Sequence, residues 1–240
     1  FSFLPLEAFG IASDALTYLK LRGGWAQVGS ATGAYQIDPY FSAGNNTIYG
    51  VTQYSQATTF PPASLQPEKV ETSEVGLEAK MFDGRLGLDL ALYNKTTTNQ
   101  ILSVAVSKAT GYNTMLINAG EFNNKGIELQ LSGTPVKTPD FEWNVTLNWA
   151  KDKSKIIDLY TDPVTGERLT SYRIGNQWST YIEARPDAPW GEIYGTGMLR
   201  RESDNAIIVN AAGRPRTQKN MRLGNVTPDW LGGLRNEFVY

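Results

Sequence analysis

The feature that most constrains this chain is an alternation of apolar and polar residues with a period of two. In residues 85–93, leucine occupies positions 86, 88, 90 and 92, and the positions between carry Arg85, Gly87, Asp89 and Ala91. The pattern recurs in residues 74–81, 127–132 and 143–149. Successive side chains of a strand point to opposite faces, so each segment predicts a strand between an apolar and a wet medium. Both a membrane β-barrel and a soluble β-sandwich fit this pattern.

Composition narrows the function classes. The formal net charge of -2 argues against a nucleic-acid partner, which usually needs a basic surface. The chain has no cysteine and no histidine, which removes disulfides, thiolate ligands, and the commonest general base and metal ligand. We therefore expect no enzyme, no cofactor and no metal site. Paired carboxylates such as Glu74 and Glu78 suit glycoside chemistry in principle, but here they occupy ordinary strand alternation.

Connection lengths favour the barrel over the sandwich. No stretch approaches the roughly 18 consecutive apolar residues of a membrane helix. Short turns are expected at 82–84 and 133–140, and long polar connections at 30–67, 103–121, 152–170 and 201–227. Short and long connections therefore alternate along the chain. Membrane barrels show this asymmetry because their periplasmic turns are short and their external loops are long.

The expected strands suggest a section of a larger barrel. Alternation and turn residues predict strands at 3–9, 18–28, 70–82, 85–102, 122–134, 141–153, 171–182, 190–200 and 229–240. About nine strands is an odd number, whereas single-chain bacterial barrels have even numbers and leave no unpaired edge in lipid. We therefore expect further strands on both sides. Eight aromatic residues suit an interfacial girdle, namely Trp25, Tyr93, Phe141, Trp143, Trp149, Trp230, Phe238 and Tyr240.

Five groups of residues, in order along the chain, carry a family resemblance. They are Leu-Lys-Leu-Arg-Gly-Gly-Trp-Ala-Gln-Val-Gly at 19–29, Leu-Gln-Pro-Glu at 65–68 with Thr72, Glu74 and Gly76, Gly-Tyr at 111–112 followed by Asn-Ala-Gly at 118–120 and Asn-Lys-Gly-Ile-Glu at 124–128, Trp-Gly-Glu-Ile-Tyr-Gly at 190–195, and Gly-Asn-Val-Thr-Pro-Asp-Trp-Leu-Gly-Gly at 224–233. Their order and spacing resemble the C-terminal half of the barrel in SusC/RagA-type TonB-dependent outer-membrane transporters, typical of the Bacteroidetes.

The resemblance implies an all-β fold, an antiparallel transmembrane β-barrel of about 22 strands. Residues 1–240 would form one section of that barrel, and the plug domain and TonB-contacting segment would lie outside it. The resemblance further implies an outer-membrane importer, driven through TonB, for polar oligomers that are either glycans or peptides. A SusD-like lipoprotein would be its surface partner. Two alternatives stay open, namely a soluble carbohydrate-binding β-sandwich and a non-transporting adhesion or structural barrel.

Six charged residues are candidates for a lumen wall because they alternate with apolar neighbours. They are Lys20, Arg22, Glu74, Glu78, Asp89 and Glu128. Such a wall could grip a plug or guide a polar solute, or its charges could simply pair with one another. Gly126 precedes an alternating run, which predicts a bulge or a close approach of another group to the backbone.

A second candidate site is the long polar segment 30–67, which is rich in aromatic residues. They are Tyr35, Tyr40, Phe41, Tyr49, Tyr54 and Phe60. Exposed aromatic rings stack on sugars or dock partner proteins, because they bring apolar area at a small entropy cost. The alternative is that they pack the loop onto itself.

Overall fold

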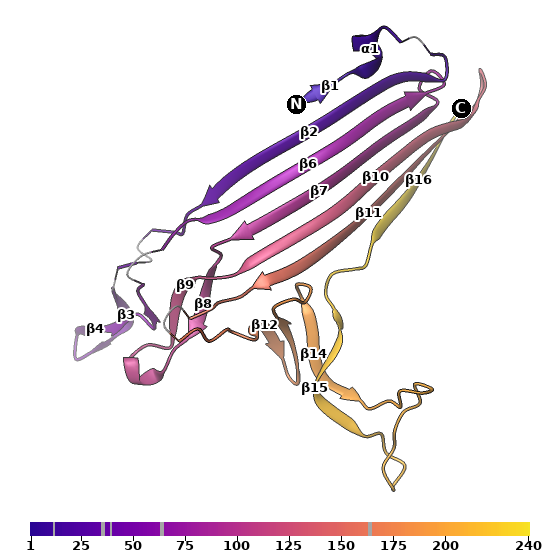
Figure 1. The fold of residues 1–240 in the computed structure, drawn as a ribbon. Helices are drawn as coiled ribbons and strands as arrows, with labels where there is room; N and C mark the ends of the chain where they lie inside the picture. The colour runs from indigo at the N-terminus through magenta and orange to yellow at the C-terminus, as the bar shows by residue number, and fades with distance from the viewer. Residues whose placement is uncertain (12, 35–36, 39, 63–64, 163–164) are drawn as a thin grey trace.

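The computed structural model describes residues 1–11, 13–34, 37–38, 40–62, 65–162 and 165–240. Its dominant feature is one tilted antiparallel sheet, which we call the wall, with strand order β1-β2-β6-β7-β10-β11-β16 (Figure 1). The wall strands are β1 (Ser2–Phe3), β2 (Leu16–Ser30), β6 (Glu68–Met81), β7 (Leu86–Thr98), β10 (Glu121–Lys137), β11 (Glu142–Asp158) and β16 (Leu231–Val239).

Two tight turns close the wall at one end, which we call the turn end. Phe82, Asp83 and Gly84 all have positive φ, between 53° and 81°, so the chain reverses within a few residues between β6 and β7. This confirms the hairpin predicted from Asp-Gly. Between β10 and β11, the Thr138 side chain accepts a hydrogen bond from the Phe141 amide at 3.0 Å. The long connections lie at the opposite end, the loop end (Figure 1).

The N-terminal prediction was wrong. The expected strand at 3–9 is a two-residue strand, β1, followed by a short helix, α1 (Pro5–Phe9). Pro5 has no amide hydrogen for a ladder, but its fixed φ suits the first turn of a helix. Gly10 then ends the helix in the left-handed region at φ 60°. Among the described residues, no helix is both long and apolar enough to span a membrane.

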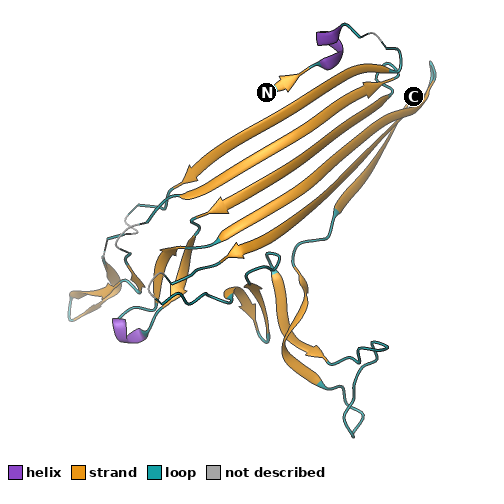
Figure 2. Cartoon of the chain, in the orientation of Figure 1, coloured by secondary structure: helices purple, strands orange, loops and turns teal. Residues whose placement is uncertain are grey.

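The registers give the wall one apolar and one polar face. Leu77, Leu90, Leu129 and Trp149 face one another in a single row across β6, β7, β10 and β11. No second sheet is stacked on this apolar face in the part of the chain that the structure describes (Figure 2). Several of its large side chains are exposed, as Val75 shows at 57% and Leu234 at 65%. A sandwich would bury this face under a facing sheet, so the soluble sandwich alternative is wrong.

The apolar face forms a belt that runs obliquely to the hydrogen-bonded rows. The row that starts at Trp25 on β2 crosses β6, β7 and β10 and meets β11 at Lys153, four residues beyond Trp149. If the two tryptophans mark one boundary of the belt, the boundary shifts by about one residue per strand. With a rise of about 3.3 Å per residue and strands about 4.8 Å apart, this corresponds to a tilt of roughly 35°. Membrane barrels have strand tilts in this range.

The connections at the loop end carry their own strands (Figure 2). Between β2 and β6 lie β3 (Phe41–Ile48), β4 (Val51–Gln56) and β5 (Thr59–Phe60). Between β7 and β10 lie β8 (Ile101–Ala105), the 3-10 turn η1 (Lys108–Thr110) and β9 (Thr114–Asn118). Between β11 and β16 lie β12 (Tyr172–Gln177), β13 (Thr180–Ala184), β14 (Glu192–Met198) and β15 (Thr217–Asn225).

The predicted strands 171–182 and 190–200 are not wall strands. They contribute to a separate sheet, which we call the short sheet, with strand order β12-β13-β14-β15. Segment 171–182 is itself a hairpin that turns at Trp178, where φ is 55°. Strands β12, β13 and β14, which these two segments form, have five to seven residues, fewer than the 9–11 needed to span a bilayer. The wall therefore has seven strands rather than about nine.

A small core attaches the short sheet to the loop end of the wall. Ile156, Leu159 and Ala184 are fully buried together. The ring of Phe122 on β10 meets that of Trp190 edge-on at 5.2 Å. Phe122 and Ile156 belong to the polar-face rows of β10 and β11, so this core lies over that face.

Because the apolar face is uncovered, we expect a charged residue placed on it to lower the stability of the wall in a membrane. In the full-length protein, Leu88→Arg should destabilise the assembled wall by roughly 2–4 kcal/mol, since an arginine at mid-membrane depth loses its hydration. The measurement is urea unfolding in lipid vesicles, followed by the mobility of the folded barrel on a gel. Gln130→Arg is the matched control because Gln130 lies on the neighbouring strand but on the polar face. Equal effects of the two changes would contradict the face assignment.

Candidate functional site

The polar face of the wall is the first candidate site. The registers bring all six predicted charged residues to this face, from β2, β6, β7 and β10. Lys20 is paired with Glu78, and Glu78 with Asp89, so three of them form one row. Arg22 and Glu128 belong to the next row, separated by Gly76 and Ala91.

Arg22 crosses a neighbouring strand to reach its partner. Its guanidinium donates two hydrogen bonds to the Asp89 carboxylate, at 2.7 and 3.0 Å. Arg22 starts on β2 and Asp89 is on β7, so the side chain passes over Gly76 of β6. A Cβ at position 76 would lie 2.5 Å from Arg22 Nε. A glycine is therefore needed there for the side chain to lie flat against the sheet.

Tyr93 makes a second crossing of the same kind. Tyr93, Gly126 and Asp152 lie in one row of β7, β10 and β11, and the Tyr93 hydroxyl donates to Asp152 Oδ1 at 3.2 Å. A Cβ on Gly126 would overlap the Tyr93 ring. The close approach predicted for Gly126 is thus the approach of a tyrosine ring. The ladder runs through position 126 without a register shift, so the glycine marks no bulge.

The flat side chains border a shallow hollow of about 380 Å³ on the polar face. Arg22 and Asp89 form part of its edge, together with Glu128, Gln130 and Asn148. The last three side chains are exposed. Carboxylate and amide groups there can donate and accept hydrogen bonds to a polar solute. Among the described residues, no cluster of three or more carboxylates is arranged to hold a metal ion.

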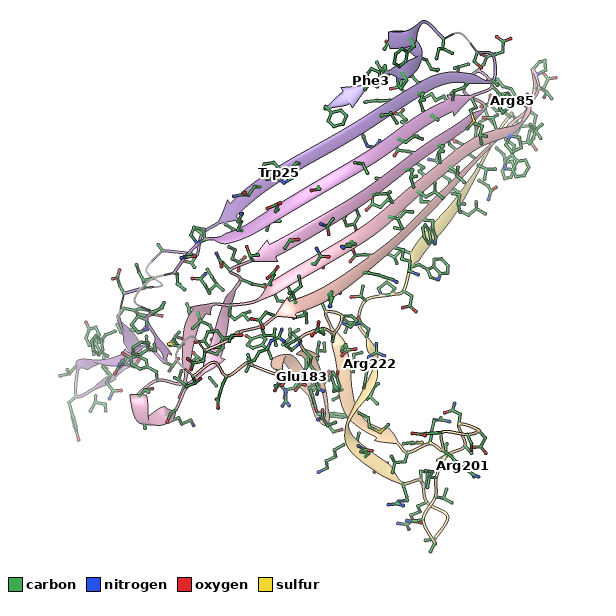
Figure 3. The ribbon with its side chains drawn as sticks, viewed as in Figure 1. Phe3, Trp25, Arg85, Glu183, Arg201 and Arg222 are labelled. Carbon is green, nitrogen blue, oxygen red and sulfur yellow. The ribbon has the colours of Figure 1, made fainter. Side chains whose placement is uncertain are left out.

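The short sheet carries a charged and aromatic cluster that no local sequence pattern predicts. Glu192 is 4% exposed and accepts a hydrogen bond from the Tyr194 hydroxyl at 2.5 Å, and a further one from Arg222. Glu183 is 6% exposed and accepts from Arg185 at 2.8 Å. Figure 3 labels Glu183 and Arg222 on this sheet. Each buried carboxylate thus has a cationic partner, as buried charges require.

Stacking completes this cluster. The guanidinium of Arg185 lies 3.7 Å from the centroid of the Tyr194 ring, and that of Arg173 lies 4.1 Å from Tyr181. The two tyrosine rings stack at 6.2 Å. Burial raises the pKa of the Tyr194 hydroxyl, and its hydrogen bond to Glu192 adds to the shift. The motif at 190–195 was visible in the sequence, but its arginine partners come from strands that only the fold brings close.

The loop aromatics divide into two groups. Tyr40, Phe41, Tyr49 and Tyr54 lie in or beside the β3–β4 hairpin and are exposed by 55–102%. Phe60 instead packs edge-on against Tyr112 at 5.0 Å. Tyr35 lies outside the described residues. Phe60 thus packs against the connection between β7 and β10, whereas the hairpin presents its aromatic rings to solvent.

Comparison with known proteins identifies the family to which this chain belongs. The family model described as "TonB dependent receptor-like, beta-barrel" matches residues 8–230. The chain belongs to that family. TonB-dependent receptor P26 of Formosa agariphila is 31% identical over 257 residues, and the match covers 98% of this chain and 25% of P26. TonB-dependent receptor SusC of Bacteroides thetaiotaomicron is 28% identical over 155 residues, or 61% of this chain and 15% of SusC.

A solved structure shares the fold. The structure of the RagAB peptide transporter aligns over 100% of this chain and 27% of its own, with a TM-score of 0.76 and 22% identity. The chain spans about a quarter of the length of P26. The resemblance to SusC/RagA-type receptors is therefore confirmed, and the wall is a section of an outer-membrane β-barrel. The turn end is periplasmic and the loop end is extracellular. The named relatives are receptors and transporters rather than enzymes.

The Tyr93 crossing predicts a non-additive pair of substitutions. In the full-length receptor, Gly126→Ala should lower the free energy of unfolding by about 1–3 kcal/mol, because the added methyl group displaces the Tyr93 ring. In a Tyr93→Ala background the same change should cost little. Urea unfolding of the wild-type receptor, both single variants and the double variant provides the test. Additive effects would show that the ring does not occupy the space above Gly126.

Proposed function

We propose that the polar face lines the lumen of a TonB-dependent importer whose cargo is a polar oligomer, either a peptide or a glycan. The observation that carries this proposal is that the bonded side chains of the polar face lie flat against the wall. Arg22–Asp89 and Tyr93–Asp152 bond sideways across neighbouring strands instead of projecting from the sheet. The space above the wall is therefore left free, while Arg22 and Asp89 neutralise each other's charge.

The exposed groups of the hollow support a polar cargo. Glu128, Gln130 and Asn148 offer hydrogen-bonding groups with both donor and acceptor character. Peptide units and sugar hydroxyls can exchange their hydrogen bonds to water for bonds to such groups at a small net change in free energy. A lipid would gain nothing from this surface. RagAB, whose fold the wall shares, is named a peptide transporter, so peptides are the first cargo to test.

The β3–β4 hairpin supports a surface partner. Phe41 and Tyr54 occupy one face of this extracellular hairpin, with exposed fractions of 68% each, and Ile48, Tyr49 and Val51 expose apolar surface at its tip. Exposed aromatic rings are typical anchors of protein interfaces. In this proposal they dock a SusD-like lipoprotein, which presents cargo to the lumen. TonB would supply energy through parts of the receptor beyond this section of the barrel.

Uptake by cells tests the importer proposal. A strain without the gene should lose growth on one class of oligomer, and the full-length gene should restore it. Labelled peptides and labelled oligosaccharides should be supplied separately, since they distinguish the two cargoes. Unchanged uptake of every oligomer would instead favour the adhesion or structural barrel.

The hairpin anchors yield a quantitative prediction. In the full-length receptor, Phe41→Ala with Tyr54→Ala should weaken lipoprotein binding by roughly tenfold or more, because two aromatic anchors are lost. Affinity should be measured with a purified SusD-like lipoprotein from the same organism. Ile207→Ala with Val209→Ala is the control, since these residues expose apolar but not aromatic side chains in another extracellular connection. Equal weakening by both pairs would contradict a specific role for the hairpin.

A further inference from the structure

Four lysines gather on the apolar face of the wall, just beyond its belt. Lys125 on β10 faces Lys153 on β11 directly. Lys151 and Lys155 lie two residues to either side of Lys153 and share its face by strand alternation. This face meets lipid over the rest of its length. All four lysines lie on the extracellular side of Trp149, the residue taken above as the boundary of the belt on β11.

The lysine group has few anionic partners. Lys155 pairs with Asp187 at 2.9 Å, and this hydrogen bond lowers the pKa of the Asp187 carboxyl. Asp229 borders the same hollow as Lys151 and Lys153. No ion pair forms at Lys125, Lys151 or Lys153 among the residues that the structure describes. Like charges directly opposite one another on a sheet are destabilising, so the pair of Lys125 and Lys153 calls for a counter-anion.

The surroundings of these lysines indicate which anion fits. On the same face, Ile127 and Trp149 lie next to Lys125 and Lys151 toward the membrane centre. Leu129, Leu131 and Leu147 continue the face toward mid-membrane. Two residues of strand rise place Lys151 roughly 6 Å beyond Trp149. This is the depth of lipid headgroups when Trp149 lies at the interface. The long lysine stems can also extend along the apolar surface while the ammonium groups reach the headgroups.

We propose that Lys125, Lys151 and Lys153 bind the phosphate groups of an anionic lipid in the outer leaflet. The acyl chains of that lipid would lie along the leucine belt, and its phosphates would neutralise the facing lysines. A free phosphate ion would gain the charge contacts but not the contact with the belt. The proposal does not depend on what passes through the lumen, because it concerns the opposite face of the wall.

Lipid retention tests this site in the full-length receptor. The receptor, delipidated in detergent, should be placed in phosphatidylcholine nanodiscs with and without diphosphoryl lipid A, and its bound lipid measured by native mass spectrometry. Wild-type receptor should retain lipid A in preference to phosphatidylcholine. Lys125→Gln with Lys153→Gln should lower that retention roughly tenfold, since each lysine near an anionic headgroup adds to the attraction.

Two controls keep the result interpretable. Lys20→Gln with Lys95→Gln removes the same charge from the polar face and should leave retention unchanged. Lys125→Arg with Lys153→Arg should keep the lipid bound and shows that the positions tolerate substitution. Equal loss in both glutamine pairs, or no loss in either, would overturn the proposal. So would displacement of lipid A by millimolar inorganic phosphate, because the site would then recognise phosphate alone.

Discussion

The structure depends on the need of every backbone amide and carbonyl inside a bilayer to find a partner within the protein. The long strands meet this need through continuous ladders, as in the pairing of β6 with β7 from residue 69 to residue 98. A sheet held in this way needs no second layer. The period of two then follows, since a single layer presents one face to lipid and the other to water. The oblique path of the belt from Trp25 to Trp149 is the expected consequence of strand tilt.

A single layer cannot stabilise its polar face by burial. Hydrogen bonds between side chains of different strands stabilise this face instead. Arg22 and Tyr93 each cross a strand, and each crossing passes over a glycine, Gly76 or Gly126. At the extracellular end, burial does contribute to stability. The short sheet uses a compact core and buried carboxylates paired with arginines, as at Glu192. One chain thus contains a membrane wall and, over the polar face of that wall, a small region built like a soluble protein.

Much of the wall could be predicted from the sequence because strand alternation is a local signal. β7 and its Asp-Gly turn were expected close to where they lie. The segments that form β12, β13 and β14 were expected in the wall because they alternate too, and only their length separates them from spanning strands. The contact of Arg22 with Asp89 could not be predicted, since it joins residues 67 positions apart. Such contacts depend on registers that the turns and loops set together, and no local pattern encodes them.

The central claim is that the wall separates lipid from water, with β7 presenting leucine to one and Asp89 to the other. The 240 residues contain no cysteine. After replacement of any cysteine elsewhere in the full-length receptor, single cysteines should be introduced at each of positions 87–92 and spin-labelled. Accessibility to oxygen, which dissolves in lipid, and to a water-soluble nickel complex should then be measured in vesicles. We predict opposite alternations, with oxygen favoured at 88, 90 and 92 and nickel at 87, 89 and 91. Two profiles that rise and fall together would contradict the account.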